Sequence, residues 1–222
     1  MYNDTARRHS PYPAFIIRIG SVLGSELILD KRKIGKLTVN VGGMFSGKSS
    51  ELLRQERRYT LANKVVFSVK PKIDDRYSTQ GIVTHDMHEL SSEAVHSSEE
   101  LKSQIYKQNS RPDVVLIDEI QFFDNGILAV INQLIVDGID VVAAGLDMDR
   151  FGKPFGVTPY LMAVADHVQK LHAVCADCGE DAWISYGMFV ADEEIVIGER
   201  EKYLPLCREC YMKRNTDNLN QT

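Results

Sequence analysis

The chain has 222 residues, 44% of them hydrophobic and 26% charged, which is typical of a globular protein rather than a disordered or fibrous one. Its 26 basic and 31 acidic side chains leave a net charge of −5, and the pI is about 5.7. This acidic balance argues against a protein that coats nucleic acid, because neutralising phosphates requires an excess of positive charge. The length predicts one substantial domain with a small appendage.

The N-terminal residues 1–35 lack a sustained hydrophobic period and include two prolines, so we predict a disordered extension there. Their apolar run, Phe15–Leu29, is interrupted by Arg18 and Glu26. No stretch of the chain reaches the roughly 18 apolar residues that span a bilayer. We therefore expect a cytoplasmic protein that has no membrane partner.

The first predicted strand, Leu37–Val41, is a short β-branched run that leads into a glycine-rich turn. From Lys48 onward the apolar residues recur at helical spacing, which predicts a helix. Lys64–Val69 is predicted as a second strand that Pro71 ends. The polar segment that follows, Lys72–Ser92, is interpreted mostly as a functional loop.

A second helix is expected to begin at Ser98 and to stop before Pro112. Asp113–Asp118 is an apolar run between acids, as expected for a strand that is buried on both faces. We predict that Asp124 caps the next helix and that Gly138 ends it.

The remaining elements of the main domain alternate in the same way. Ile139–Ala144 is predicted as a buried strand, Pro159–Ala165 as a short helix, and Val168–Val174 as a strand that enters a cysteine-containing region. Strands that alternate with helices predict a mainly parallel sheet with helices on both faces and with ligands at the carboxyl ends of the strands.

The turn after the first strand matches the pattern G-x-x-x-x-G-K-[ST] at every fixed position. The glycines allow several backbone N–H groups to point at one phosphate, and the following helix N-terminus adds its positive end. Lys48 would carry a positive charge to the β and γ phosphates, and the hydroxyl of Ser49 would bind Mg²⁺. Because a strand precedes the pattern and a helix follows it, we favour a triphosphate site over a chance glycine turn. The segment is Gly42, Gly43, Met44, Phe45, Ser46, Gly47, Lys48 and Ser49.

Two acids follow the buried strand, where a phosphate loop commonly has its carboxylate partner. Asp118 is the candidate for holding Mg²⁺, directly or through water. Glu119 could accept a proton from an attacking hydroxyl or water, or it could be a solvated loop carboxylate. This pair does not separate a kinase from a hydrolysing ATPase.

The four cysteines fall into two C-x-x-C pairs, which we interpret as one closed tetrahedral Zn²⁺ site that staples a loop. Four unrelated buried cysteines are the alternative. A redox role would need only one pair, in a thioredoxin-like context that is missing here. The predicted ligands are Cys175, Cys178, Cys207 and Cys210.

Taken together, the motifs resemble those of the cytosolic-type (type II) thymidine kinase family. The resemblance covers about Lys36 to Lys213 and depends on several separated motifs in the right order. These are Met44–Ser49, Lys72–Ser78, Thr84–Asp86, Asp118–Phe123, Gly145–Asp147, Lys153–Gly156, both cysteine pairs and Lys202-Tyr203.

The resemblance implies an enzyme that transfers the γ-phosphate of Mg-ATP to the 5′-hydroxyl of thymidine or deoxyuridine, giving dTMP in pyrimidine salvage. Glu119 would be the general base, and ATP contacts would extend from the phosphate loop to Asp118, Glu119, Ile120 and Gln121. The family also implies a homotetramer and feedback inhibition by dTTP. The residues implied to contact the acceptor substrate are Met44, Asp74, Arg76, Phe122, Leu146, Ser185, Val196, Ile197, Gly198 and Tyr203.

The expected fold class is therefore α/β: a P-loop (RecA-like) domain with a mainly parallel sheet and helices on both faces, plus a small zinc-binding lasso domain that closes over the acceptor. Phe122 and Leu146 could instead be core residues. The predicted boundaries are an N-terminal extension over 1–35, the nucleotide-binding domain over 36–170, the lasso domain over 171–214 and a frayed tail over 215–222.

The chain departs from the family pattern in the lasso segment. Ser185-Tyr186-Gly187 stands where the family usually has Thr-x-Arg, and Gly198-Glu199 replaces paired glycines. Two alternatives stay open besides the kinase, and these departures motivate the second of them. One is a zinc-ribbon P-loop ATPase that acts on nucleic acid, and the other is a degenerate kinase homologue that only binds nucleotide.

Overall fold

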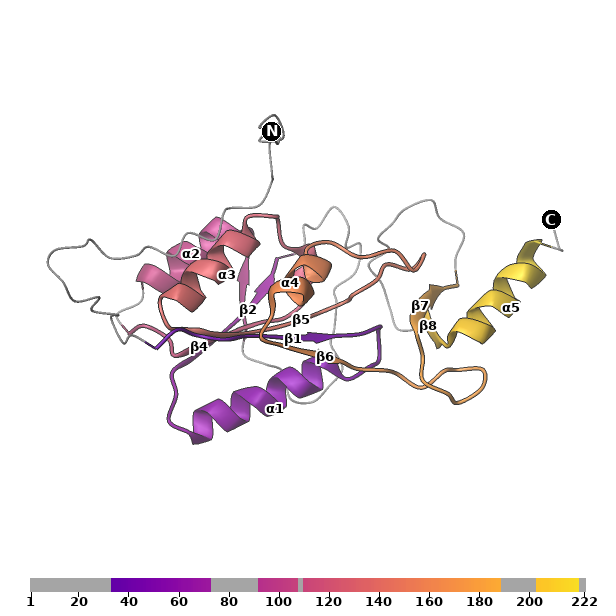
Figure 1. Ribbon diagram of the computed structural model, residues 1–222, viewed down its shortest axis with the longest axis horizontal. Helices are drawn as coiled ribbons and strands as arrows, with labels where there is room; N and C mark the ends of the chain where they lie inside the picture. The colour runs from indigo at the N-terminus through magenta and orange to yellow at the C-terminus, as the bar shows by residue number, and fades with distance from the viewer. Residues whose placement is uncertain (1–32, 73–91, 108–109, 189–202, 220–222) are drawn as a thin grey trace, which may run out of the picture. The chain divides into compact units, whose positions relative to one another are not determined.

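The computed structural model describes residues 33–72, 92–107, 110–188 and 203–219 of the chain (Figure 1). The chain divides into two units, Met1–Lys33 and Ile34–Thr222, and the described helices and strands all lie in the second. The predicted N-terminal extension thus lies almost entirely outside the described residues. None of the helices within the described ranges has both the length and the apolar character that crossing a bilayer would require.

A six-stranded sheet forms the centre of this unit, and each of its neighbouring strands is parallel to the next. This arrangement confirms the predicted mainly parallel sheet. Because the strands are parallel, their carboxyl ends meet at one edge, which is where a ligand site is expected. In spatial order the strands are β3 (Glu93–Val95), β2 (Val66–Pro71), β4 (Val114–Ile117), β5 (Asp140–Gly145), β1 (Leu37–Val41) and β6 (His167–Lys170).

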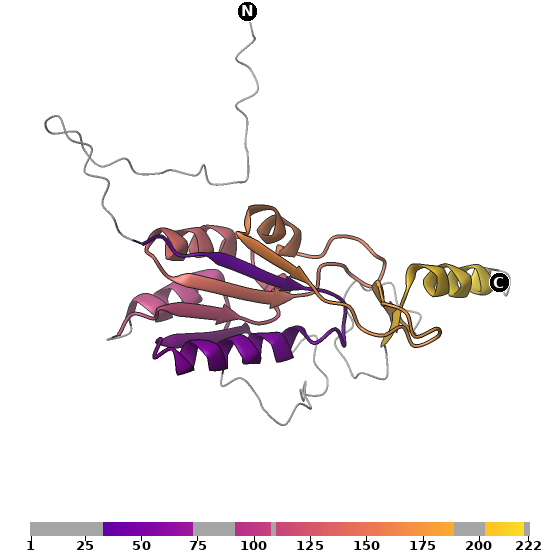
Figure 2. The ribbon, with the colours of Figure 1, turned by 60° about the horizontal axis from the view of Figure 1, so that its bottom comes forward.

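Helices cover both faces of the sheet, as Figures 1 and 2 show. On one face, α2 (Ser98–Lys107), α3 (Ile127–Val136) and α4 (Thr158–Val164) bury the larger hydrophobic cluster. On the other face, α1 (Lys48–Leu61) packs Leu52 onto a smaller cluster of strand residues. The alternation of side chains along a strand sends neighbouring residues of β4 to opposite faces, which is why all four of its residues are buried.

Two sequence-predicted boundaries are wrong. The helix expected after Asp124 begins at Ile127 with Gly126 at its N-cap, and the Asp124 carboxylate instead accepts hydrogen bonds from Gly126 N–H and from Ser98. The strand expected over Val168–Val174 ends at Lys170. Beyond that residue the chain leaves the sheet and pairs locally with the first cysteine turn, as in the 2.7 Å hydrogen bond from Ala182 N to Ala173 O.

A second, two-stranded antiparallel sheet lies beside the cysteines. It pairs β7 (Ile184–Gly187) with β8 (Tyr203–Leu206), and α5 (Arg208–Leu219) follows it directly. Its small core joins Ile184 and Leu206 to two of the cysteines. Helix α5 runs into the segment predicted to be frayed, and the domain boundary predicted at residue 170 stays a prediction.

Candidate active site

The phosphate loop connects β1 to α1 and is tightly folded. Gly42 has a φ of 148°, and a Cβ atom there would lie 2.1 Å from the carbonyl oxygen of Leu171, so only glycine fits. The Lys48 ammonium group donates to Gly43 O at 2.7 Å, and Ser46 Oγ donates to the same oxygen at 2.8 Å. The lysine is thus folded onto its own loop, next to the backbone that would hold a phosphate.

Two acidic residues at the carboxyl end of β4, Asp118 and Glu119, interact through their charges with the Lys48 ammonium group. The hydroxyl of Ser49 donates to the Asp118 carboxylate, which also accepts Glu119 N–H at 3.0 Å. Burial lowers the pKa of Lys48, although the negative charges of Glu119, Asp118 and Asp147 oppose that shift. The loop and the end of β4 therefore form one charged cluster, as the two sequence motifs predicted.

The pKa values of the two carboxyl groups in the cluster are shifted upward, opposite to the shift of Lys48. Burial raises the pKa of Asp118, against hydrogen bonds from Glu119 N–H and Ser49. Burial also raises the pKa of Glu119, and the neighbouring Asp118 charge adds to the increase, while Lys48 and Gln121 oppose it. A carboxylate with a raised pKa is a better proton acceptor than an ordinary one.

Backbone strain is also concentrated in the cluster. Among the described non-glycine residues, positive φ angles occur at Phe45, Asn63 and Glu119, and two of these three belong to the site. Each left-handed residue costs on the order of 1 kcal/mol, which persists only where surrounding contacts hold it. At Glu119 the left-handed turn begins the short helix η2 (Ile120–Phe122).

The residues of η2 that the sequence assigned to ligands lie in different environments. Gln121 is buried, donates to the Glu119 carboxylate through Nε2 and accepts Leu146 N–H at 2.9 Å through Oε1. Phe122 is half-buried and meets the ring of Phe155 edge to face, with 5.7 Å between the ring centroids. Leu146 is half-buried as well. Partial exposure of these two apolar side chains is compatible with a base pocket.

The hairpin of β7 and β8 reaches the phosphate loop. Ser185 is buried, and its hydroxyl accepts the backbone N–H of Met44 at 2.7 Å. Tyr203 is buried and pairs across the hairpin with Gly187. Two of the predicted acceptor contacts thus belong to the hairpin beside the loop. The others, Asp74, Arg76, Val196, Ile197 and Gly198, lie outside the described residues.

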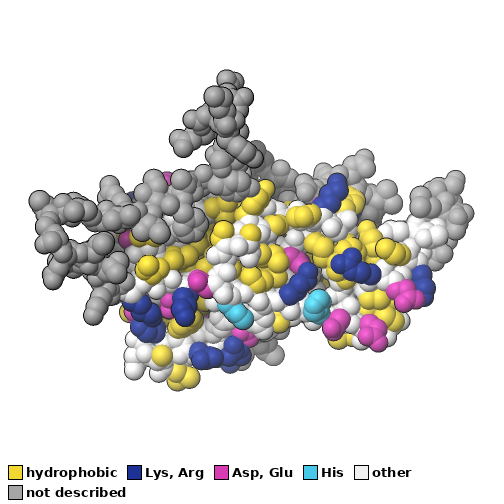
Figure 3. Space-filling model, viewed as in Figure 1, with side chains coloured by type: hydrophobic (Ala, Val, Ile, Leu, Met, Phe, Trp, Pro, Cys, Tyr) yellow, Lys and Arg dark blue, Asp and Glu magenta, His cyan; other side chains and the backbone are white. Residues whose placement is uncertain are grey.

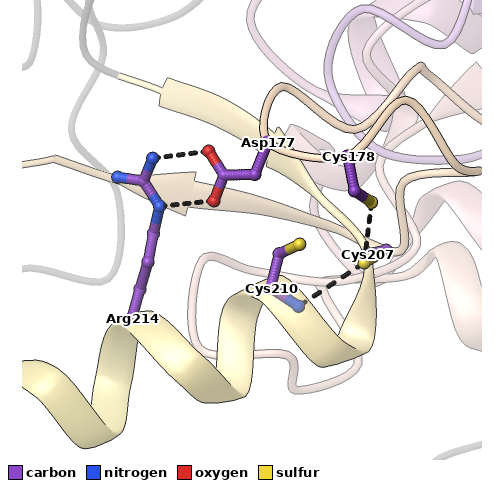
Figure 4. Close-up of polar contacts among 5 residues, drawn as sticks. All are labelled: Asp177, Cys178, Cys207, Cys210 and Arg214. Carbon is purple, nitrogen blue, oxygen red and sulfur yellow. Dashed lines mark hydrogen bonds and ion pairs between the residues drawn. The ribbon is translucent and has the colours of Figure 1, made fainter.

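The four cysteine sulfurs all lie within 4.8 Å of one another. Figure 4 shows three of these cysteines, Cys178, Cys207 and Cys210, and Sγ of Cys178 is 3.6 Å from Sγ of Cys207. Tetrahedral coordination with Zn–S bonds of about 2.3 Å would place the sulfurs about 3.8 Å apart, so the arrangement fits a metal ion. Backbone N–H groups outweigh burial and lower the pKa of Cys175 to about 6, which favours a thiolate ligand. The group can therefore hold a metal ion.

An ion pair fastens the second cysteine turn to the first. Arg214 on α5 donates to both oxygens of Asp177, at 2.8 and 2.6 Å, as Figure 4 shows. The bidentate geometry fixes the direction of α5 as well as its distance from the turn. Together with the sulfur cluster, it ties α5 to the start of the hairpin.

One contact of the site was missed by sequence reasoning. The Lys170 ammonium group at the end of β6 lies 2.7 Å from a carboxylate oxygen of Asp147, a buried residue after β5. It is a close ion pair rather than a well-aligned hydrogen bond. Asp147 stands in one of the recognised motifs, but no local pattern marks Lys170, because its partner is set by the order β5-β1-β6 in the sheet.

Fold and site together define a class: an α/β P-loop nucleotide-binding protein with an attached module whose four cysteines can hold a metal ion. The model of the thymidine kinase family matches residues 35–211. The chain belongs to the thymidine kinase family.

Relatives from several bacteria agree with this assignment. The thymidine kinase of Bacteroides thetaiotaomicron is 45% identical over 84% of this chain and 92% of its own length. That of Porphyromonas gingivalis is 45% identical over 83% of this chain and 88% of its own, and that of a Rhodothermus species 43% over 80% and 82%.

Proposed function

We propose that the protein is a thymidine kinase, which transfers the γ-phosphate of Mg-ATP to the 5′-hydroxyl of thymidine or deoxyuridine. The observation that carries the proposal is the cluster of Lys48, Asp118 and Glu119, where a buried ammonium group and two carboxyl groups of raised pKa meet. Membership of the thymidine kinase family supports thymidine as the acceptor.

In this reaction the chain would contribute positioning and one proton transfer. The phosphate loop would bind the triphosphate through its N–H groups, and Lys48 would exchange the Gly43 carbonyl for phosphate oxygens. Ser49 and Asp118 would hold Mg²⁺, which neutralises charge on the phosphates when bound. Glu119 would accept the proton of the 5′-hydroxyl as that oxygen attacks the γ-phosphorus.

The cysteine cluster would hold a structural Zn²⁺. All four ligands are supplied by the protein, so no coordination position is left for substrate, and the metal would fix the hairpin that carries Ser185. Thiolate ligands of this kind fit a reducing compartment, which supports a cytoplasmic location. The segment 179–206 between the cysteine pairs is proposed to close over the nucleobase.

The two alternatives have less support. A nucleic-acid-stimulated ATPase would need a basic surface, yet on the face drawn in Figure 3 lysine and arginine side chains are interspersed with acidic ones. A homologue that only binds nucleotide would not need a carboxylate poised as a base, whereas Glu119 has a raised pKa beside Lys48.

A coupled assay for ADP, run with and without thymidine, tests the function. We expect turnover only with thymidine, weaker or no turnover with other nucleosides, and no stimulation by DNA. Glu119→Gln should keep ATP binding and lose about 100-fold or more in kcat. Glu99→Gln, at an exposed position on α2, is the matched control and should be fully active. Thymidine-independent hydrolysis, or full activity of Glu119→Gln, would contradict the proposal.

Two further properties come with the family. We propose a homotetramer, to be measured by light scattering coupled to size exclusion, and inhibition by dTTP, to be measured in the same kinase assay. A stable monomer would contradict the first, and full activity at dTTP concentrations well above the KM for thymidine would contradict the second.

A further inference from the structure

The side-chain amide of Gln121 is engaged by protein groups at both ends. Its Nε2 donates to Oε2 of Glu119, and its Oε1 accepts the backbone N–H of Leu146 at 2.9 Å. Only 4% of the residue is exposed. The residue therefore bridges the acid at the end of β4 and the segment after β5, and both ends of its amide are used within the protein.

Chemistry fixes the direction of this bridge. A backbone N–H can only donate, so the amide oxygen must face Leu146, which leaves the amide nitrogen for Glu119. A carboxylate accepts hydrogen bonds at both oxygens, so the pairing from Nε2 to Oε2 is complementary. If the amide were flipped, its NH2 group would face the Leu146 N–H, so that a donor met a donor. Its oxygen would face the Glu119 carboxylate, so that an acceptor met an acceptor.

Gln121 packs closely against two glycines. A Cβ atom at Gly145 would lie 2.5 Å from Oε1 of Gln121, so the end of β5 has no side chain where the amide sits. Gly156, with a φ of 54°, would carry a Cβ 2.3 Å from the carbonyl oxygen of Gln121. Because Gly145 and Gly156 have no Cβ atom, there is room for the side chain and the backbone of Gln121, and any larger residue at either position would clash with it.

We propose that Gln121 is a positioning residue for the reaction, which holds the Glu119 carboxylate in a fixed place relative to Leu146 and makes no contact with ATP. The inference rests on the proposed function, in which Glu119 is the general base. It replaces the ATP-binding role that the family resemblance implies for Gln121.

The bridge also has a consequence for the acceptor. The family resemblance implies that Leu146 contacts the acceptor substrate, and its N–H is the other end of the link to Glu119. A shift of the segment after β5 would therefore be transmitted to the carboxylate. Correct seating of the nucleobase and correct placement of the base are then parts of one rigid arrangement.

The test is a double-mutant cycle in the full-length protein. Gln121→Met keeps the length of the side chain and removes both hydrogen bonds. We expect kcat to fall about 10- to 100-fold while the KM for ATP changes less than about twofold. In a Glu119→Gln background the same change should cost less than about twofold, because a residue that acts through Glu119 has nothing left to position. Gln133→Met, on the exposed side of α3, is the control.

A second variant keeps one hydrogen bond of the bridge, and its fold is checked separately. Gln121→Glu keeps an acceptor for Leu146 N–H but presents a second carboxyl group to the buried Glu119, which should lower both kcat and the melting temperature, so far-UV circular dichroism must show that the variant is folded before its kcat is compared. Multiplicative losses in the cycle, or unchanged kcat in both variants, would overturn the positioning role.

Nucleotide affinity separates this inference from the proposed function. Titration calorimetry with a non-hydrolysable ATP analogue needs no turnover, and we expect the same Kd for wild type and Gln121→Met. A Kd raised tenfold would assign Gln121 to ATP and overturn the inference, even if the kinase activity is present. Absence of thymidine-dependent turnover with an unchanged Kd would instead reject the proposed function and leave Gln121 excluded as an ATP ligand.

Discussion

The Asp124 carboxylate anchors the segment that carries Glu119 and Gln121, and removing it should destabilise the protein. The segment runs from the end of β4 to Asp124, which accepts Ser98 N–H at 2.8 Å, Ser98 Oγ–H at 2.6 Å and Gly126 N–H at 2.8 Å. These bonds join the starts of α2 and α3. The perturbation is Asp124→Ala, which removes all three acceptor contacts at once.

The size of the loss in unfolding free energy depends on which hydrogen-bond donors are left without an acceptor. Ser98 is 5% exposed, so its N–H and hydroxyl would be left buried, at about 1 kcal/mol each or somewhat more. Gly126 is exposed, and water can replace the lost acceptor there at little cost. The free energy of unfolding should therefore fall by about 2–3 kcal/mol, a large share of the roughly 5–15 kcal/mol of an ordinary domain. The melting temperature should fall by about 4–12 °C.

The assay is urea denaturation followed by far-UV circular dichroism. Asn125→Ala is the matched control, since the residue is adjacent and exposed. Asp124→Asn, which keeps one acceptor oxygen, should lose an intermediate amount. A loss below about 0.5 kcal/mol for Asp124→Ala would refute the reasoning, because the Ser98 donors would then have found other partners.

The same carboxylate gives a pH dependence of known sign. Partial burial alone would raise the pKa of Asp124, but hydrogen bonds from Ser98 and Gly126 outweigh it and leave the pKa below its usual range. A depressed pKa in the folded state means that the stabilisation is complete above the ordinary aspartate pKa of about 4. It is lost as the pH falls through the folded-state value. The difference between wild type and Asp124→Ala should therefore shrink below about pH 4.

Three further changes probe the site. Ser185→Ala removes the acceptor of Met44 N–H, so the affinity for an ATP analogue should fall about 5- to 30-fold by calorimetry, and Ser185→Thr should restore it. Lys170→Met leaves the buried Asp147 carboxylate without its cation, which should cost about 1–3 kcal/mol in urea denaturation. Cys207→Ser should lower the zinc content, measured by mass spectrometry, from about one ion per chain to well below it.

Each of these has an outcome that would contradict it. Unchanged nucleotide affinity in Ser185→Ala would mean that the hairpin does not support the phosphate loop. Wild-type stability of Lys170→Met would show that solvent screens the Asp147 charge. Full zinc occupancy in Cys207→Ser would remove that thiolate from the metal site.

Much of the site could be predicted because its parts are contiguous in the chain. The phosphate loop lies in a single turn between β1 and α1. Its predicted phosphate and Mg²⁺ contacts depend on residues of that turn alone, namely Gly42, Gly47, Lys48 and Ser49. The apolar run before Asp118 predicted a buried parallel strand for a similar reason, because hydrophobic periodicity is a local property. The C-x-x-C spacing likewise predicted the sulfur cluster.

Contacts between distant segments were decided by tertiary structure alone. Ser185 meets Met44 from 141 positions away, and Lys170 meets Asp147 because β1 lies between β5 and β6. The bridge made by Gln121 needs the end of β5 to approach η2, where Gly145 leaves room. The sequence by itself determined which chemical groups are present and which turn, helix or strand carries each of them. Their partners depend on strand order and close packing, which no local periodicity encodes.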